Sequence, residues 1–307
     1  MKFFRPAFVA ALAGLAMISA ASAQTTVTLD PLTSFGPRGD GSIQPGDSIG
    51  INPVTGNNVA ISAPGGYGIQ PGDTGAAPVS TNGFNMRGLA FDPISGNLVF
   101  VDTHSGSGGA STLATNSAVY ILDSDSGQII GALNTSNIIG GTYTHVVAGV
   151  ADDGAVYVCN QTTASQTTGF KIYRWPTANV NATNFNVPSI VAYSNVIGTS
   201  LGTPGERLGE TLDVRGAGTN TQILVGSSSL NGTGTNIFLF TTVDGTNFTP
   251  HRISFPGVIT SAVFNDGIAF GAGNTFWTKQ VGKAFYYLSY DPVTYAGTVI
   301  SSFSASS

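Results

Sequence analysis

The chain has 307 residues, of which 41 are glycine, 41% are hydrophobic and only 9% are charged. This apolar and aromatic content excludes an intrinsically disordered protein, and the glycines follow no three-residue period, which excludes collagen. The formal net charge of -5 argues against electrostatic binding to nucleic acid or to an anionic membrane. Glu206 and Glu210 are the only glutamates, a poor supply for surface helices that indicates an all-β protein.

The N-terminus has the organisation of a secretory signal. Lys2 and Arg5 precede the apolar run 7–18, and an A-x-A cleavage site ends at Ala23. The apolar run is shorter than the ~20 residues that a membrane-spanning helix needs. We therefore predict that residues 1–23 are a signal peptide, that the mature protein is secreted, periplasmic or at the cell surface, and that it does not insert into a membrane.

The segment 24–85 is rich in Gly, Pro, Ser and Thr, and only 48–62 has the pattern of a β-hairpin. The run Ile51–Asn57 recurs forty positions later as Phe91–Asn97. Each run contains a strand end, an Asn-Pro or Asp-Pro turn start and a Gly-Asn turn exit. We predict a partial blade here, with a strand that helps to close a ring.

From residue 86 to residue 307, short runs of β-branched and aromatic residues are bounded by turn residues and fall into four modules of four strands. The first strands start about 55–65 residues apart, slightly more than is usual for propeller blades. The predicted strands are 87–91, 98–102, 118–122 and 128–133; 145–150, 155–160, 170–175 and 189–193; 210–214, 221–226, 236–241 and 251–255; and 267–270, 275–279, 285–290 and 297–303.

Several predicted strands are apolar at every position, as at 98–101 and 237–240. Continuous apolarity implies that both faces of the strand are covered, which in an antiparallel protein means sheets packed on sheets. Blades stacked around an axis cover every sheet in this way. We predict a β-propeller or a propeller-like array of four-stranded antiparallel blades. A β-sandwich is the alternative, and it explains the four-strand grouping less well.

Cys159 is the only cysteine, so no internal disulfide can form. It lies in the apolar run 156–159, which predicts a buried and unreactive thiol.

Several motifs between Phe84 and Phe303 occur in an order that resembles one family. They are 86–93 (MRGLAFDP), 119–123 with Gly127, 150–157 (VADDGAVY), 171–175 (KIYRW), 242–248 (TVDGTNF) and 268–273 (IAFGAG). Together they resemble an uncharacterised family of exported bacterial proteins, a domain of unknown function with a propeller-like β repeat. The resemblance implies the fold and export, and it carries over no catalytic residue.

Catalytic and metal motifs are weak. No G-x-S-x-G elbow is present, and Asp102, His104 and Ser105 stand close together in a Gly/Ser-rich segment that is more simply a loop. The three histidines show no metal-ligand spacing. The run 123–127 (DSDSG) begins like a calcium loop but lacks the later ligands. We therefore predict no cofactor, with weak calcium binding at this turn as the exception.

The alternative from another class is a metal-dependent, lactonase-like propeller hydrolase. Such chemistry needs a metal held by converging Glu, Asp and Asn side chains at one mouth of the channel. The candidates are Glu210, Asp102, Asn160 and Asp213, which stand near the ends of predicted inner strands. Glu210 precedes a predicted first strand, which is the strand nearest the axis.

The favoured interpretation is non-catalytic: an exported binding or scaffold protein whose polar loops, such as 103–117 and 161–169, contact an unknown protein or glycan. Aromatic residues near strand ends are the side chains that could stack on a sugar. They are Tyr143, Trp175, Trp277 and Tyr290. Packing in the core or between blades explains the two tryptophans equally well.

Overall fold

The computed structural model describes residues 49–51, 58–60, 86–102, 118–124, 129–138, 143–163, 169–195, 201, 206–229, 237–255, 267–279 and 284–303. The strands are β1 (Ile49–Ile51), β2 (Asn58–Ala60), β3 (Met86–Phe91), β4 (Leu98–Asp102), β5 (Ala118–Leu122), β6 (Ile129–Ala132), β7 (Tyr143–Val150), β8 (Val156–Thr163), β9 (Lys171–Trp175), β10 (Ile190–Ser194), β11 (Glu206–Arg215), β12 (Gln222–Ser229), β13 (Ile237–Thr242), β14 (Phe248–Ile253), β15 (Gly267–Phe270), β16 (Thr275–Lys279), β17 (Phe285–Tyr290) and β18 (Gly297–Phe303). The 3-10 turn η2 (Gly218–Asn220) is the one helical element in these ranges.

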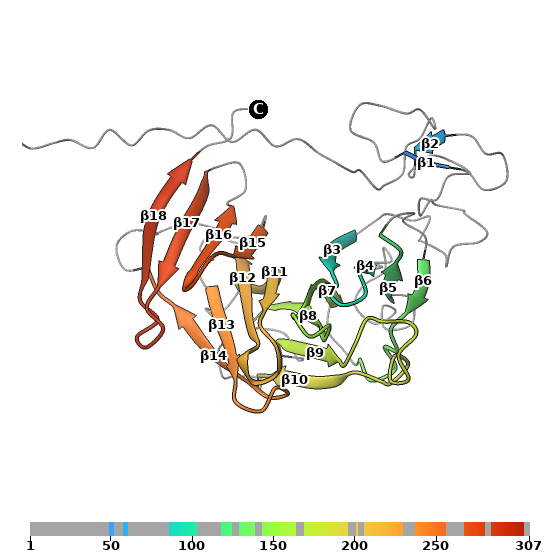
Figure 1. Ribbon diagram of the computed structural model, residues 1–307. Helices are drawn as coiled ribbons and strands as arrows, with labels where there is room; N and C mark the ends of the chain where they lie inside the picture. The colour runs from blue at the N-terminus through green and yellow to red at the C-terminus, as the bar shows by residue number, and fades with distance from the viewer. Residues whose placement is uncertain are drawn as a thin grey trace, which may run out of the picture.

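The strands from β3 onward form four antiparallel groups of four, each in simple sequential order: blade 1 (β3–β6), blade 2 (β7–β10), blade 3 (β11–β14) and blade 4 (β15–β18). Figure 1 shows these blades as an arc from blade 1 (teal and green) to blade 4 (red), with the first strand of each nearest the middle. Successive first strands pack on one another, β3 on β7, β7 on β11 and β11 on β15. The predicted propeller-like array is confirmed, and a two-sheet sandwich does not describe it.

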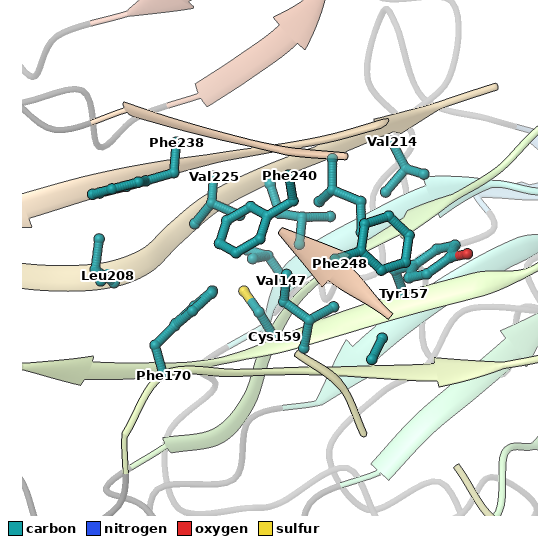
Figure 2. Close-up of a cluster of buried hydrophobic side chains, with 14 of the residues drawn as sticks. Val147, Tyr157, Cys159, Phe170, Leu208, Val214, Val225, Phe238, Phe240 and Phe248 are labelled. Carbon is teal, nitrogen blue, oxygen red and sulfur yellow. The ribbon is translucent and has the colours of Figure 1, made fainter. Parts of the chain in front are cut away.

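Three apolar clusters fill the three spaces between blades, and single strands contribute to two of them. On β8, Val156 and Val158 face blade 1, whereas Tyr157 and Cys159 face blade 3. On β13, alternate residues likewise enter the cluster shared with blade 2 and the cluster shared with blade 4. Figure 2 shows the cluster between blades 2 and 3, with Cys159 among the aromatic rings. Cover on both faces therefore explains the continuous apolar run of β13, as predicted, whereas described blades cover only one face of the run 98–101 on β4.

Blades 2 and 3 are also joined through the backbone. Near the start of β11, Arg207 and Leu208 pair with Thr163 and Thr162 at the end of β8. The two blades thereby form one eight-stranded sheet, a continuity that the sequence modules did not predict.

Most predicted strands have the observed bounds within a residue or two, but β8 and β12 each end three residues later than predicted, and β11 and β14 begin earlier. β11 begins at Glu206 rather than at residue 210, because a bulge lets the strand continue past Gly209. β14 begins at Phe248 and runs through Pro250. Proline has no backbone N–H, and an edge strand tolerates this because no further strand requires a donor at that position. Glu210 is therefore inside the first strand of blade 3 rather than in front of it.

The Asp-Pro turns predicted from the sequence have one geometry at two places. Asp92 follows β3 and Asp291 follows β17. In each case the aspartate N–H donates to the backbone carbonyl five residues later, and the aspartate backbone carbonyl accepts the N–H of the residue four positions later. Each carboxylate also accepts backbone N–H groups of the turn, an Asx turn. The left-handed position of the turn is Gly96 (φ 76) in one case and Tyr295 (φ 56) in the other.

In the described part of the chain, none of the helical structure is long and apolar enough to cross a membrane.

Candidate functional site

The blades have two unlike ends. Because neighbouring strands are antiparallel, the connections from first to second strands all lie at one end, and those from second to third strands lie at the other. The first end, the turn rim, consists of residues 92–97, 151–155, 216–221 and 271–274. The second end, the loop rim, contains residues 103–117, 164–170, 230–236 and 280–284, which lie wholly or mostly outside the described residues.

On the turn rim, the turn of blade 2 is bonded to the turn of blade 3. The N–H of Asp152 donates to the carbonyl of Gly216 (2.8 Å), and the Asp152 carboxylate accepts the N–H of Gly216 (3.1 Å). The Asp153 carboxylate accepts the N–H of Gly218 (3.0 Å). Both glycines have positive φ, so the turn can present these N–H groups to the carboxylates. The Asp-Asp-Gly segment is therefore a structural clasp.

Arg215 extends the clasp from blade 3 to blade 4. Its Nη1 donates to the carbonyls of Gly271 (3.1 Å) and Gly273 (2.6 Å). Its Nε and Nη2 donate to Oε1 of Gln222, and Nη2 also donates to the hydroxyl of Tyr290 (3.1 Å). The planar guanidinium uses all sides of its fork in this way, which leaves it a structural role.

Sequence reasoning missed Arg215. Arg174 also has a structural role, since its Nε donates to the hydroxyl of Tyr157 (3.1 Å). The signal for Arg215 is its place at a strand end before a Gly-x-Gly turn, which many surface arginines share.

Near the loop rim, β11 carries a bulge that brings it close to β8. The register skips between Leu208 and Thr211, and Gly209 has φ 84. A Cβ on Gly209 would lie 2.1 Å from the carbonyl oxygen of Asn160. The Cys159 thiol lies 3.9 Å from the carbonyl oxygen of Gly209. Only glycine fits this close backbone approach.

The predicted metal ligands Asn160 and Asp213 use their side chains for structure. Asn160 donates through Nδ2 to the carbonyl of Gly169 (3.1 Å), and its Oδ1 accepts the N–H of Lys171 (2.7 Å). Asp213 accepts the N–H of Phe270 (2.6 Å), which ties β11 to β15. Burial raises the pKa of the Asp213 carboxyl.

Glu210 and Asp102 are the other two predicted ligands. Glu210 is half-buried on β11 and acts electrostatically on Cys159 of blade 2, whereas Asp213 bonds to blade 4. Asp102 ends β4. Among the described residues, no three His, Cys, Asp or Glu side chains form a group that could hold a metal ion. The lactonase-like metal set therefore stays a prediction that this part of the structure does not assemble.

Nucleophilic groups are similarly dispersed. Burial, with a smaller contribution from the negative charge of Glu210, raises the pKa of the Cys159 thiol, so the nucleophilic thiolate is disfavoured. His104 and Ser105 lie outside the described residues, as does most of the predicted calcium turn 123–127. His251 lies on the outer strand β14, with its Nε2 3.0 Å from Oγ1 of Thr241.

The loop-rim ends of blades 2 and 3 instead gather neutral polar groups. The buried residues His145 on β7, Asn160 and Gln161 on β8, and Ser227 on β12 lie near the end of their strands that carries the longer loops. These side chains are buried, and both polar atoms of the Asn160 amide are bonded within blade 2, so they support the strand ends beneath the loops and do not themselves reach a ligand. This is the candidate functional region of the molecule.

The predicted sugar-stacking aromatics differ in exposure. Trp175 is buried, and its Nε1 donates to the carbonyl of Asn134 (2.9 Å). Tyr290 is buried beside Arg215. Trp277 is 38% exposed and stacks on Tyr287, with ring centroids 4.3 Å apart. Of these three, only Trp277 has a free ring surface.

No protein-family model matches the sequence, and a search of curated proteins found no match. Among solved structures, a protein from Lactobacillus plantarum is 12% identical over 71% of this chain, with a TM-score of 0.41. The match covers 55% of that protein, so this chain spans about half its length.

A gluconolactonase from Xanthomonas campestris is 12% identical (72% of this chain, 77% of that one, TM-score 0.38). The glutaminyl cyclase of Myxococcus xanthus is 13% identical (71% and 70%, TM-score 0.36). Likenesses this distant carry no argument about activity.

Proposed function

We propose that this protein is an exported, non-catalytic binding module of the bacterial cell envelope whose loop rim contacts a glycan. The observation that carries the proposal is the difference between the two rims. At the turn rim, the short connections between first and second strands of blades 2, 3 and 4 are bonded to one another through Asp152, Asp153 and Arg215, and of the connections at this end only 176–189 of blade 2 is long. The loop rim carries the other long connections, above buried polar side chains of β7, β8 and β12. Rigid scaffolds with long loops at one end are typical of binding proteins.

Export rests on the sequence 1–23, with its basic start, short apolar run and A-x-A site. A glycan suits the loop rim because uncharged hydroxyl side chains, such as those of the loop residues, bind sugar hydroxyls without needing charge. The polar composition of 103–117, which is rich in Ser, Thr and Gly, supports the same ligand class.

The test is binding of the labelled mature chain to an array of bacterial envelope polysaccharides. We expect binding to a defined glycan, and its loss when residues 103–117 are replaced by a short Gly-Ser linker. The matched control is Val243→Ser on the turn-rim side, where the side chain is 92% exposed; it should bind as the wild type does. Absence of binding to every glycan, or equal binding by the linker variant, would contradict the proposal.

The lactonase-like alternative is tested separately by titrating Ca²⁺ and Zn²⁺ into the wild type and into Glu210→Ala, with lactone hydrolysis measured in parallel. The proposed function predicts no lactone turnover and no metal binding that depends on Glu210. Tight binding that is lost in the variant, together with turnover, would establish the hydrolase instead.

A further inference from the structure

Blade 1 presents an apolar face on which no described sheet packs. On β3, Leu89 and Phe91 are each 58% exposed. Their partners in the register on β4 are Phe100 and Leu98, so the four side chains lie on one face. The opposite face of β4 carries Val99 and Val101, which are buried against blade 2. β4 is thus apolar on both sides but is covered by a described blade on only one.

Blade 4 presents a second such face at the other end of the arc. Trp277 pairs with Tyr287, and Phe285 pairs with Phe303, across β16, β17 and β18. These rings stack at 4.3 Å and 5.1 Å between centroids. The other face of the blade packs on blade 3. Among the described strands, no packing comparable to that of β11 on β15 joins blade 4 to blade 1.

The hairpin β1–β2 has the geometry of an inner strand pair. Ile51 pairs with Asn58 and Gly50 with Val59, forty positions before Phe91 with Leu98 and Ala90 with Val99. The two hairpins therefore have the same register and the same connection length. Both connections contain an Asx-Pro start and a Gly-Asn exit, so β1–β2 repeats β3–β4 in sequence and in pairing.

The stretch 24–85 is long enough for one blade. The first strands of blades 1 to 4 start about 60 residues apart, whereas β1 starts at Ile49 and β3 at Met86, so the outer strands of a fifth blade would draw on residues on either side of the hairpin. Because this stretch directly precedes blade 1 in the chain, the blade that it forms belongs on the side of blade 1 away from blade 2. That side is where Leu89 and Phe91 are exposed.

We infer that β1–β2 is the inner pair of a fifth blade, built from residues 24–85, which packs between the exposed faces of blades 1 and 4 and closes the ring. One occupant thus covers both apolar faces. An intramolecular cover also explains why a strand as apolar as β4 stands at the end of the described arc, where an exposed sheet face would otherwise promote aggregation. The inference concerns architecture and does not depend on the ligand of the loop rim.

Disulfide trapping tests the position of the hairpin. Where blade 1 meets blade 2, a Cβ on Gly88 would approach the backbone of Val147 and Ala148. In the repeat, Ser48 corresponds to Gly88, and Leu89 of β3 corresponds to Ala148 of β7. If the fifth blade packs on blade 1 as blade 1 packs on blade 2, Ser48 would lie next to Leu89. The chain has a single native cysteine, which is buried, so Ser48→Cys with Leu89→Cys gives a clean assay. The matched control pairs Ser48→Cys with Val243→Cys, whose site is on blade 3.

We expect the Ser48/Leu89 pair to form an intramolecular disulfide at least about tenfold faster than the control pair, because proximity raises the effective concentration of the thiols. Equal rates for the two pairs would overturn the inference. A disulfide between two chains, together with a dimer in light scattering, would also overturn it by showing that a second copy covers the face.

Hydroxyl-radical labelling of the unmodified full chain gives a second measurement that needs no variant. For Phe91 and Trp277, labelling of the native protein is divided by labelling after unfolding, and exposed Val243 and Val293 serve as references. The fifth blade predicts a protection of Phe91 and Trp277 several times that of the references. Protection no greater than that of the references would contradict it.

Discussion

Strand β13, at the junction of blades 2 and 3, and strand β4 of blade 1 are similar in sequence but differ in what covers their faces. β13 and β4 are both continuous apolar runs, at 237–240 and 98–101. Both faces of β13 are buried against described blades, whereas only one face of β4 is. An apolar run therefore reports how many faces of a strand the folded chain covers. On β4 the described structure supplies one cover fewer than the run predicts, and this difference is the observation on which the fifth-blade inference rests.

The largest effect that we expect is at the junction of blades 2 and 3. Phe240 is fully buried and contacts the rings of Tyr193 (4.9 Å) and Phe170 (5.9 Å). Phe240→Ala should lower the free energy of unfolding by about 3–5 kcal/mol, through lost burial and a residual cavity. The measurement is urea unfolding followed by circular dichroism. Val243→Ala, at an exposed position on the turn after β13, should change it by less than about 0.5 kcal/mol.

Phe91→Ala in the same series sharpens the comparison. A cost near that of Val243→Ala would show that the outer face of blade 1 is open to solvent. A cost of about 2 kcal/mol or more would show that it is covered, as the fifth blade requires.

An intermediate effect separates two glycines with similar backbone conformation, one on each rim. Gly96 and Gly209 have φ of 76 and 84. A Cβ on Gly96 meets nothing within 4 Å, whereas one on Gly209 would collide with the carbonyl oxygen of Asn160. Gly96→Ala should cost about 1 kcal/mol, the penalty of the left-handed backbone alone. Gly209→Ala should cost at least about 2 kcal/mol more, because backbone must move. Equal costs in urea unfolding would show that β8 and β11 are not in close contact.

The smallest effect is a pH dependence at the contact between blades 3 and 4. Burial raises the pKa of Asp213 in the folded state. The stability contributed by its protonated form is therefore present below the unfolded pKa and is lost as the pH rises through the folded pKa. Asp213→Asn, whose amide oxygen can still accept the N–H of Phe270, should gain stability relative to the wild type as the pH is raised from about 3 to about 7. Thermal unfolding at each pH measures this difference.

Asp291→Asn provides the control with the opposite sign. Backbone N–H groups of Thr294 and Val293 lower the pKa of the exposed Asp291, so its contribution is lost as the pH falls. This variant should therefore lose stability relative to the wild type as the pH is raised. A relative loss for Asp213→Asn as well would contradict the sign expected for a buried carboxyl.

Strand positions could be predicted from the sequence because turn chemistry and apolar runs are local signals. Asp92 and Asp291 mark the same turn by a property of their own side chains, and the runs at 98–102 and 285–290 have the observed bounds. Side-chain direction and partners are not local. Asn160 and Asp213 were expected near the ends of inner strands; Asp213 lies near the end of β11, whereas Asn160 lies inside β8, which continues to Thr163. Which backbone groups their oxygens meet depends on β9 and β15. The Gly209 bulge was missed for the same reason.

Each described blade is held mainly by its immediate neighbours, through one apolar cluster per junction and, between blades 2 and 3 and between blades 3 and 4, through turn-rim bonds. An arrangement coupled only between neighbours behaves like a one-dimensional array, in which the terminal units open first and the middle ones last. A fifth blade would change this behaviour, because a closed ring of blades has no terminal blade at which local unfolding can begin. Amide exchange in blades 1 and 4 would then be as slow as in blades 2 and 3, and the protein would open in a single cooperative step.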